Sequence, residues 1–210
     1  MNENNNGRGL FYGVIGVATL IVAIIGATFA YFSVNASITN NSDIAGSTVE
    51  LSETTITGTL TRETASTVSM VPLKTADLQK GITGEGGKQC IDANGAKVCD
   101  IYTLTIKNTS SAPVSLAGNL NITATDMADL RWSLLESTTS ATGATAKEVN
   151  DTVIVANELL EAKTGTKTYH FVIWFNETDG VQNDQAGKSY TGTVSFTAAN
   201  GGKITAQFSS

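Results

Sequence analysis

The chain has 210 residues, of which 41% are hydrophobic and only 15% charged, and its formal net charge is -6. An acidic chain without a basic stripe has little with which to neutralise phosphates, so we expect no binding to nucleic acid. The length suits one sizeable domain together with a targeting segment.

An apolar segment from Leu10 to Phe32 predicts an export signal. Arg8 precedes it, and small residues close it before a polar sequence that carries no Lys or Arg until Arg62. This layout is typical of a signal peptide covering residues 1–31, which would contact the membrane only before cleavage. The expected cleavage region is Ala30, Tyr31 and Phe32. The run is also long enough to cross a bilayer, so a retained membrane anchor stays open.

Residues 32–46 follow as a predicted N-terminal arm and linker. Phe32, Val34, Ala36 and Ile38 alternate with polar residues, which indicates a strand with one apolar face. A free terminal strand can pair within its own subunit or complete the sheet of a neighbour, and we expect donation to a neighbour. Donation from head to tail does not close on itself, so it would produce an open filament of identical copies.

Residues 47–210 predict a single all-β domain, because Thr and Val abound and Gly, Asn and Asp clusters separate stretches of period two. Short strands at such intervals predict a jelly-roll-like antiparallel β-sandwich. The expected strands are Thr48–Leu60, Thr67–Leu73, Tyr102–Ile106, Val114–Ala124, Leu130–Leu135, Thr152–Ala156, Thr168–Asn176, Tyr190–Phe196 and Lys203–Phe208. Short helical turns are expected at Thr75–Lys80 and Ala156–Ala162, and an exposed loop at Ser137–Thr145.

The strand Thr168–Asn176 is apolar on both faces. Tyr169 and Phe171 belong to one face, and Val172 and Trp174 belong to the other. A strand of this pattern is covered on both sides. Val172 and Trp174 are therefore the candidate wall of a groove that accepts the arm.

The two cysteines flank a predicted hairpin. With Asn94-Gly95 at a type I′ turn, Cys90 falls opposite Cys99. A directly opposed, non-hydrogen-bonded pair has Cα atoms about 4.5 Å apart, which suits a disulfide. Half of a metal site is the alternative, and it would need further soft ligands from a chain with one His.

We find no catalytic motif in the sequence, and we expect neither enzymatic activity nor a cofactor. His170 is alone in an apolar strand and fits a structural role. The loop after residue 175 offers weak calcium candidates, with oxygen-bearing side chains at a spacing unlike that of an EF-hand, so a plain loop stays open. These candidates are Glu177, Asp179, Asn183 and Asp184.

Three stretches together resemble the TasA/camelysin family of secreted β proteins from Gram-positive and related bacteria. They are IGATFAYFS, CDIYTLTIKNTSSAPVSL and HFVIWFNETDGVQNDQAGKSYTGTVSFTA. The third is the most specific, through Trp174, Gln182-Asn183-Asp184, Gly187-Lys188-Ser189 and the strand through Phe196. Thr125–Lys167 carries no likeness. The resemblance implies a jelly roll, export with a SipW-type signal peptidase, and polymerisation into extracellular fibres of a biofilm matrix.

We therefore expect a structural protein, secreted to the extracellular matrix or the cell surface, whose partner is itself. Two alternatives stay open. A pilin-like subunit would keep the segment 10–31 as a filament-core helix, and a surface adhesion or binding module would keep it as a membrane stem. The first residue of the mature chain separates the three readings.

Overall fold

The computed structural model describes Val17, Thr19 and residues 37–39, 48–52, 55–64, 69–185 and 187–210. The chain divides into two units, Met1–Asn35 and Ala36–Ser210. The expected signal segment and its cleavage region lie outside the described residues, apart from Val17 and Thr19, which are helical.

Among the residues that the structure describes, we find no helix that is both long and apolar enough for a membrane span.

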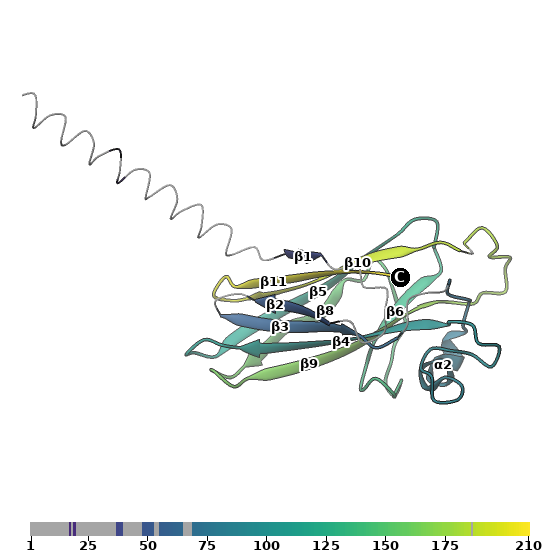
Figure 1. Ribbon diagram of the computed structural model, residues 1–210, viewed down its shortest axis with the longest axis horizontal. Coiled ribbons are helices and arrows are strands. Elements are labelled where there is room, and N and C mark those ends of the chain that lie inside the picture. The colour runs from purple at the N-terminus through teal and green to yellow at the C-terminus, as the bar shows by residue number, and fades with distance from the viewer. Residues whose placement is uncertain are drawn as a thin grey trace, which may run out of the picture. The chain divides into compact units, whose positions relative to one another are not determined.

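The second unit is a sandwich of two β-sheets, as expected (Figure 1). One sheet, sheet A, has the strand order β1-β11-β10-β5-β8, and the other, sheet B, has the order β2-β3-β4-β9-β6-β7. Neighbouring strands are antiparallel except for β1, which runs parallel to β11. The strands are β1 (Ser37–Thr39), β2 (Thr48–Ser52), β3 (Ile56–Arg62), β4 (Cys99–Asn108), β5 (Val114–Ala124), β6 (Leu130–Leu135), β7 (Lys147–Glu148), β8 (Val153–Leu160), β9 (Thr166–Phe175), β10 (Tyr190–Ala198) and β11 (Lys203–Ser209).

The connections give the sandwich its jelly-roll character. From β4 to β10 the chain crosses from one sheet to the other at every connection except the one between β6 and β7. Wrapping of this kind joins two sheets through a shared core. β11 then returns as a hairpin partner of β10, and β2 and β3 extend sheet B beyond β4.

A main core lies between the sheets, and β3, β5, β10 and β11 contribute to it by burying every second side chain along most of their length. β5 and β10 alternate buried with partly or fully exposed positions along most of their length, as their period-two sequences predict. The largest contributions come from aromatic rings, which bury the most apolar area per residue. The fully buried rings of this core include Tyr102, Trp132, Phe171, Tyr190 and Phe196.

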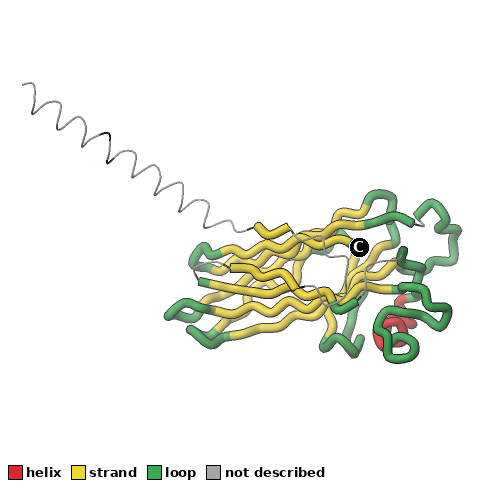
Figure 2. The backbone as a smooth tube through the Cα atoms, in the orientation of Figure 1, coloured by secondary structure: helices red, strands yellow, loops and turns green. Residues whose placement is uncertain are grey.

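A second, smaller core lies on the outer face of sheet B. The helix α2 (Leu78–Thr83), preceded by a short 3-10 turn (η1, Thr75–Asp77), packs Leu78 and Ile82 into this core. Figure 2 shows this helix at one end of the sandwich, among loops. The sequence predicts helical structure here, and Leu78, Gly81 and Ile82 form its buried side.

Three expected elements differ from the structure. The stretch Thr48–Leu60, predicted as one strand, forms two antiparallel strands, β2 and β3. Residues 156–160 belong to strand β8, so the helical turn predicted at Ala156–Ala162 is wrong. Near Thr67–Leu73 the structure has two isolated parallel bridges, Met70 with Lys97 and Leu73 with Asn176, while residues 65–68 lie outside the described residues. Because Met70 and Leu73 pair with two different segments of the chain, the apolar pattern here does not form a regular strand.

Two glycines leave room for phenylalanine rings inside the main core. Gly118 of β5 pairs with Phe196 of β10, and Gly192 of β10 pairs with Phe208 of β11. A Cβ atom added to Gly118 would lie 2.3 Å from Phe196 Cε1, and one added to Gly192 would lie 2.1 Å from Phe208 Cζ. Both distances are far inside van der Waals contact, so the rings occupy the space that a side chain would take.

The substitution Gly118→Ala should therefore destabilise the fold, because the buried ring of Phe196 has no free space into which to move. We expect a loss of about 1–3 kcal/mol in the free energy of unfolding, measured by denaturant titration. Gly180→Ala is the matched control, since its nearest outside atom would be 3.8 Å away, and it should stay within about 0.5 kcal/mol of the unaltered protein. Equal effects of the two variants would contradict this account.

Candidate functional site

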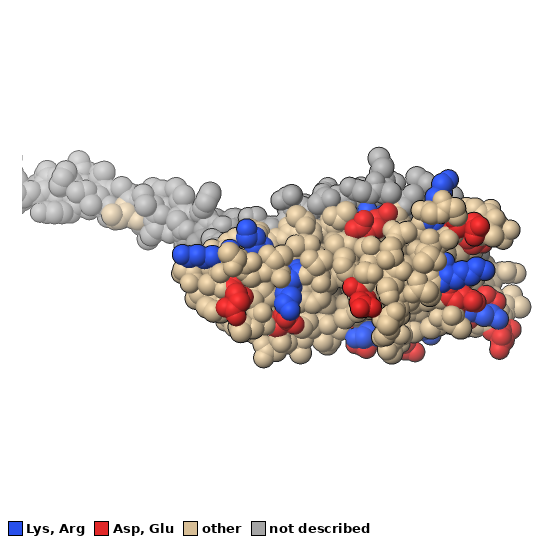
Figure 3. All heavy atoms as spheres, turned by 90° about the horizontal axis from the view of Figure 1, so that it is seen from below, with Lys and Arg blue, Asp and Glu red and all other residues tan. Residues whose placement is uncertain are grey.

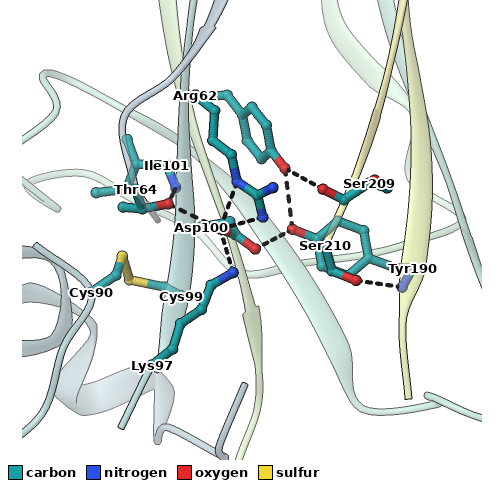
Figure 4. Close-up of polar contacts among 11 residues, drawn as sticks. Arg62, Thr64, Cys90, Lys97, Cys99, Asp100, Ile101, Tyr190, Ser209 and Ser210 are labelled. Carbon is teal, nitrogen blue, oxygen red and sulfur yellow. Dashed lines mark hydrogen bonds and ion pairs between the residues drawn. A yellow bond between two sulfur atoms is a disulfide. The ribbon is translucent and has the colours of Figure 1, made fainter. Parts of the chain in front are cut away.

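A buried ionic cluster joins the two sheets at one end of the sandwich (Figure 4). The Asp100 Oδ1 atom of β4 accepts hydrogen bonds from Arg62 Nη2 at 2.8 Å and from Thr64 Oγ1 at 2.9 Å. Lys97 Nζ lies 2.8 Å from the same oxygen. From the opposite sheet, the Tyr190 hydroxyl donates to Asp100 Oδ2 at 2.7 Å.

The cluster continues to the end of the chain. The Tyr102 and Tyr190 hydroxyl oxygens lie 3.5 Å apart, and Tyr102 also donates to the carbonyl of Ser209. Ser210 N donates to the carbonyl of Tyr190, and Tyr190 N donates to Ser210 Oγ. The last residues of the chain are therefore fixed to the same carboxylate network.

Burial decides the electrostatics of this cluster. Asp100 is fully buried, and Arg62 and Lys97 are exposed by only 3% and 1%. Burial lowers the pKa of Lys97, against the attraction of Asp100. Burial, followed by the charge of Asp100, raises the pKa of Tyr190 well above its usual value. The arrangement keeps the phenol neutral as a donor to the carboxylate.

The disulfide that the sequence predicts is present. Cys90 and Cys99 are bonded, with their Cα atoms 4.9 Å apart, and both are fully buried. A loop this short should stabilise the fold by about 2–3 kcal/mol in the chain-entropy account. The bridge ties the segment after α2 to the first residue of β4, one residue before Asp100.

The hairpin between the cysteines has another register from the one predicted. Ile91, not Asp92, lies opposite Lys97, and Gly95 has a φ of 78° while Asn94 does not have a positive φ. Gly95 N donates to the carbonyl of Asp92, which makes a type I turn followed by a glycine bulge. The reason is the Asp92 carboxylate, which accepts from Asn94 N and Ala96 N and closes the turn.

A cavity of about 270 Å³ lies between α2 and this hairpin. Leu73, Ile91 and Val98 give it apolar lining, whereas Asp77, Lys80, Glu85 and Asp92 bring charges to it. This volume is below the usual range of small-molecule sites, and it suits a single side chain.

Within the predicted arm and linker, residues 32–46, the structure describes residues 37–39. Phe32, Val34 and Ala36 lie outside the described residues. Ile38 belongs to β1, where it pairs with Ala206 of β11 in the same chain, between Ser37 with Thr205 and Thr39 with Gln207. The arm thus adds a short parallel strand to the edge of sheet A.

The candidate groove at Val172 and Trp174 is occupied by the chain itself. Both residues are fully buried in the second core, together with the disulfide, Leu78 and Ile82. The prediction that this strand is covered on both faces is confirmed. The cover is α2 with its neighbouring loop, so we do not place an acceptor groove at these two residues.

The weak calcium candidates do not converge in the structure. Glu177 lies 3.8 Å from Lys74 Nζ, and among the residues that the structure describes no group of three His, Cys, Asp or Glu side chains could hold a metal ion. The loop that carries these candidates is held instead by Asp129 of the β5–β6 turn, whose Oδ2 atom accepts from Gln182 and Gln185. These two hydrogen bonds lower the pKa of Asp129.

His170 has a structural contact, Nδ1 to Thr103 Oγ1 at 3.0 Å, and partial burial lowers its pKa. The ionic cluster is what sequence reasoning missed. A signal for it exists, because Asp100 is the one charged residue inside the apolar run of Val98–Ile106, and a charge in such a run needs a buried partner. Its partners, Arg62 and Tyr190, are far away in sequence.

No protein-family model matches the chain, and no curated protein matches it. Solved structures give weak similarities. A FixG-related protein from Vibrio parahaemolyticus is 12% identical with a TM-score of 0.28, and the match covers 52% of this chain and 76% of that one. A protein described as ApaA from Bordetella pertussis is 15% identical with a TM-score of 0.28, with coverage of 73% and 90%. Similarities at this level carry no argument about function.

Replacing Asp100 with Asn should leave Arg62 and Lys97 buried without their carboxylate. We expect the free energy of unfolding to fall by about 3–5 kcal/mol, measured by denaturant titration. Tyr190→Phe, which removes one hydrogen bond to the charged group, should cost about 1.5–3 kcal/mol. Asp184→Asn on the exposed loop is the control, with a change within about 0.5 kcal/mol. A variant at Asp100 as stable as this control would show that the cluster does not hold the sheets.

The buried tyrosines predict an alkaline transition. Burial raises the pKa of Tyr169 to about 12 and also raises the pKa values of Tyr102 and Tyr190. Above about pH 10 the unfolded chain loses phenol protons that the folded chain retains, so stability must fall as pH rises. The lowered pKa of Lys97 makes stability rise with pH instead, and this gain is complete near the usual pKa of a lysine.

Ultraviolet absorbance of phenolate during an alkaline titration measures this transition, with circular dichroism to follow the fold. Ionisation should be delayed and should coincide with unfolding. Tyr169→Phe should reduce the pH dependence at little cost in stability, because the Tyr169 hydroxyl is buried without a hydrogen-bond partner. Phenolate of Tyr102, Tyr169 or Tyr190 that forms near pH 10 in a folded chain would contradict the burial of these rings.

Proposed function

We propose that this protein is a secreted structural subunit that associates with copies of itself into extracellular or cell-surface fibres, such as those of a biofilm matrix. The observation that carries the proposal is β1. This strand adds three residues of the N-terminal arm to an edge of sheet A, beside the C-terminal strand β11. The resemblance of the sequence to the TasA/camelysin family supports the same function.

An added edge strand can be exchanged between copies. The ladder between β1 and β11 consists of backbone pairs at Ser37, Ile38 and Thr39, and backbone pairing is the same whether the strand comes from its own chain or from another. Exchange of an identical element between copies costs little, because the contacts in the two arrangements match. We therefore place the acceptor at the outer edge of β11, around Thr205, Ala206 and Gln207.

The proposed location outside the cell is consistent with the disulfide bond. A bond between Cys90 and Cys99 is maintained in oxidising surroundings, which include the exterior of the cell. Export would require a signal peptidase, of the SipW type according to the resemblance, and contact with the membrane would be limited to the N-terminal segment before cleavage.

Paired cysteines in β1 and β11 test the exchange. In Ser37→Cys/Thr205→Cys the two positions are register partners, so oxidation can link them. In fibres recovered from producing cells, exchange links different chains, and denaturing electrophoresis without reductant should show a ladder of oligomers. A link within one chain would give only a monomer band.

Two controls accompany this pair. Each single cysteine variant should give at most dimers, and Ser37→Cys/Thr193→Cys should not cross-link, because β11 separates β1 from β10. Fibres whose cross-links are all intramolecular would overturn arm exchange. A protein that stays monomeric at every concentration would overturn the structural function itself.

A further inference from the structure

One end of the sandwich, here called the turn end, carries exposed lysines. It is formed by the turns at residues 109–113, 161–165 and 199–202, which join β4 to β5, β8 to β9 and β10 to β11. Figure 3, which keeps the left-to-right order of Figure 1, shows lysine or arginine side chains at this left end. Lys107, Lys163 and Lys203 are exposed there, without a salt bridge to any residue that the structure describes, whereas Lys167 pairs with Glu158.

Lys163 stands out at this end. It has a φ of 62°, a conformation that a non-glycine residue rarely adopts, and its backbone N donates to the carbonyl of Ser110 at 2.9 Å. Further turn hydrogen bonds run from Thr164 N to the carbonyl of Ala162 and from Gly165 N to that of Glu161. A lysine fixed at the tip of an ordered turn loses little backbone entropy on binding, and backbone strain of this kind often marks a functional position.

The opposite end, here called the loop end, is acidic and contains the cavity beside α2. It is formed by residues 63–98, 125–129 and 176–189. Its exposed acidic side chains outnumber its exposed basic ones: Asp77, Glu85, Asp126, Glu177, Asp179 and Asp184 against Lys74, Lys80, Lys88 and Lys188.

The cavity at the loop end has the chemistry of a lysine site. Its Leu73, Ile91 and Val98 lining can take the four methylene groups of a lysine stem. Its charged lining has three carboxylates, Asp77, Glu85 and Asp92, against one ammonium group, that of Lys80, so Asp77 and Glu85 can take the ammonium group of a second lysine. Neither carboxylate forms a salt bridge with a residue that the structure describes.

From this complementarity we infer that the cavity between α2 and the disulfide hairpin binds the Lys163 side chain of a second copy of this chain. The contact joins the turn end of one copy to the loop end of the next, which makes it heterologous and open, as a filament requires. The inference rests on the proposed function and adds to it a second, electrostatic contact that sets the polarity of the fibre. High salt weakens such a contact.

Charge reversal on each side tests the contact, with fibre formation by purified full chain followed by light scattering and electron microscopy. Lys163→Glu and, separately, Asp77→Lys/Glu85→Lys should each raise the concentration needed for fibres by about tenfold. A mixture of the two variants should restore assembly, because each retains one original surface and offers one reversed surface that is complementary to the other variant. Sodium chloride should inhibit the unaltered protein and the rescued mixture alike.

Matched controls separate the contact from overall charge. Lys88→Glu changes net charge as Lys163→Glu does, and Lys88 is exposed at the loop end but does not line the cavity. Asp179→Lys/Asp184→Lys reverses two carboxylates of the same end, again outside the cavity. Both controls should assemble like the unaltered protein. Ala93→Phe should fill the cavity from its rim without a change of charge and should block assembly.

The outcomes distinguish the two proposals. Fibres of the unaltered protein that form equally well from Lys163→Glu, Asp77→Lys/Glu85→Lys and Ala93→Phe overturn the lysine contact and leave the proposed function standing. Control variants impaired as strongly as the contact variants also overturn it, because net charge alone would then explain the effect. An unaltered protein that forms no fibre under any condition overturns the proposed function.

Discussion

A carboxylate removed completely from water must be neutralised where it lies, and in this protein that requirement falls on Asp100. The solution draws on both sheets, since the cations come from Arg62 and Lys97 and the phenol of Tyr190 reaches across from β10. Isolated buried ion pairs contribute little net stability, but removal of one partner is costly. The network therefore favours the mutual arrangement of the sheets in which Asp100 meets all of these partners, because any other arrangement would leave a buried charge unpaired.

The segment between β3 and β4 depends on the same region. Its hairpin is fixed by the disulfide one residue before Asp100, and its Lys97 side chain is a member of the ionic cluster. With the hairpin fixed, α2 can cover Val172 and Trp174, and the space left between helix and hairpin becomes the cavity. Covalent, ionic and apolar contacts thus position one outer corner of sheet B.

Local patterns in the sequence predict much of the sandwich, because the period-two alternation of β5, β10 and β11 reflects burial of one face. The doubly apolar β9 likewise predicts a second cover. The hairpin register was not predictable from Asn94-Gly95 alone, since the Asp92 side chain selects the turn. The β1–β11 pair and the contacts of Asp100 with Arg62 and Tyr190 escaped prediction for another reason: these partners are distant in the chain, and one sequence carries no record of such contacts.

If the chain is exported as proposed, the place of β1 has a consequence for the order of events during export. β1 lies near the beginning of the chain and its partner β11 near the end, so the partner emerges last from any translocation channel. Until then β1 has no partner strand within its own molecule, whereas a finished copy nearby would already contain a folded β11. Long-range pairing of this kind forms late because the intervening chain must be ordered first. Under the proposed function, molecules that emerge among completed copies would meet intermolecular partners before their own, which would couple assembly to secretion.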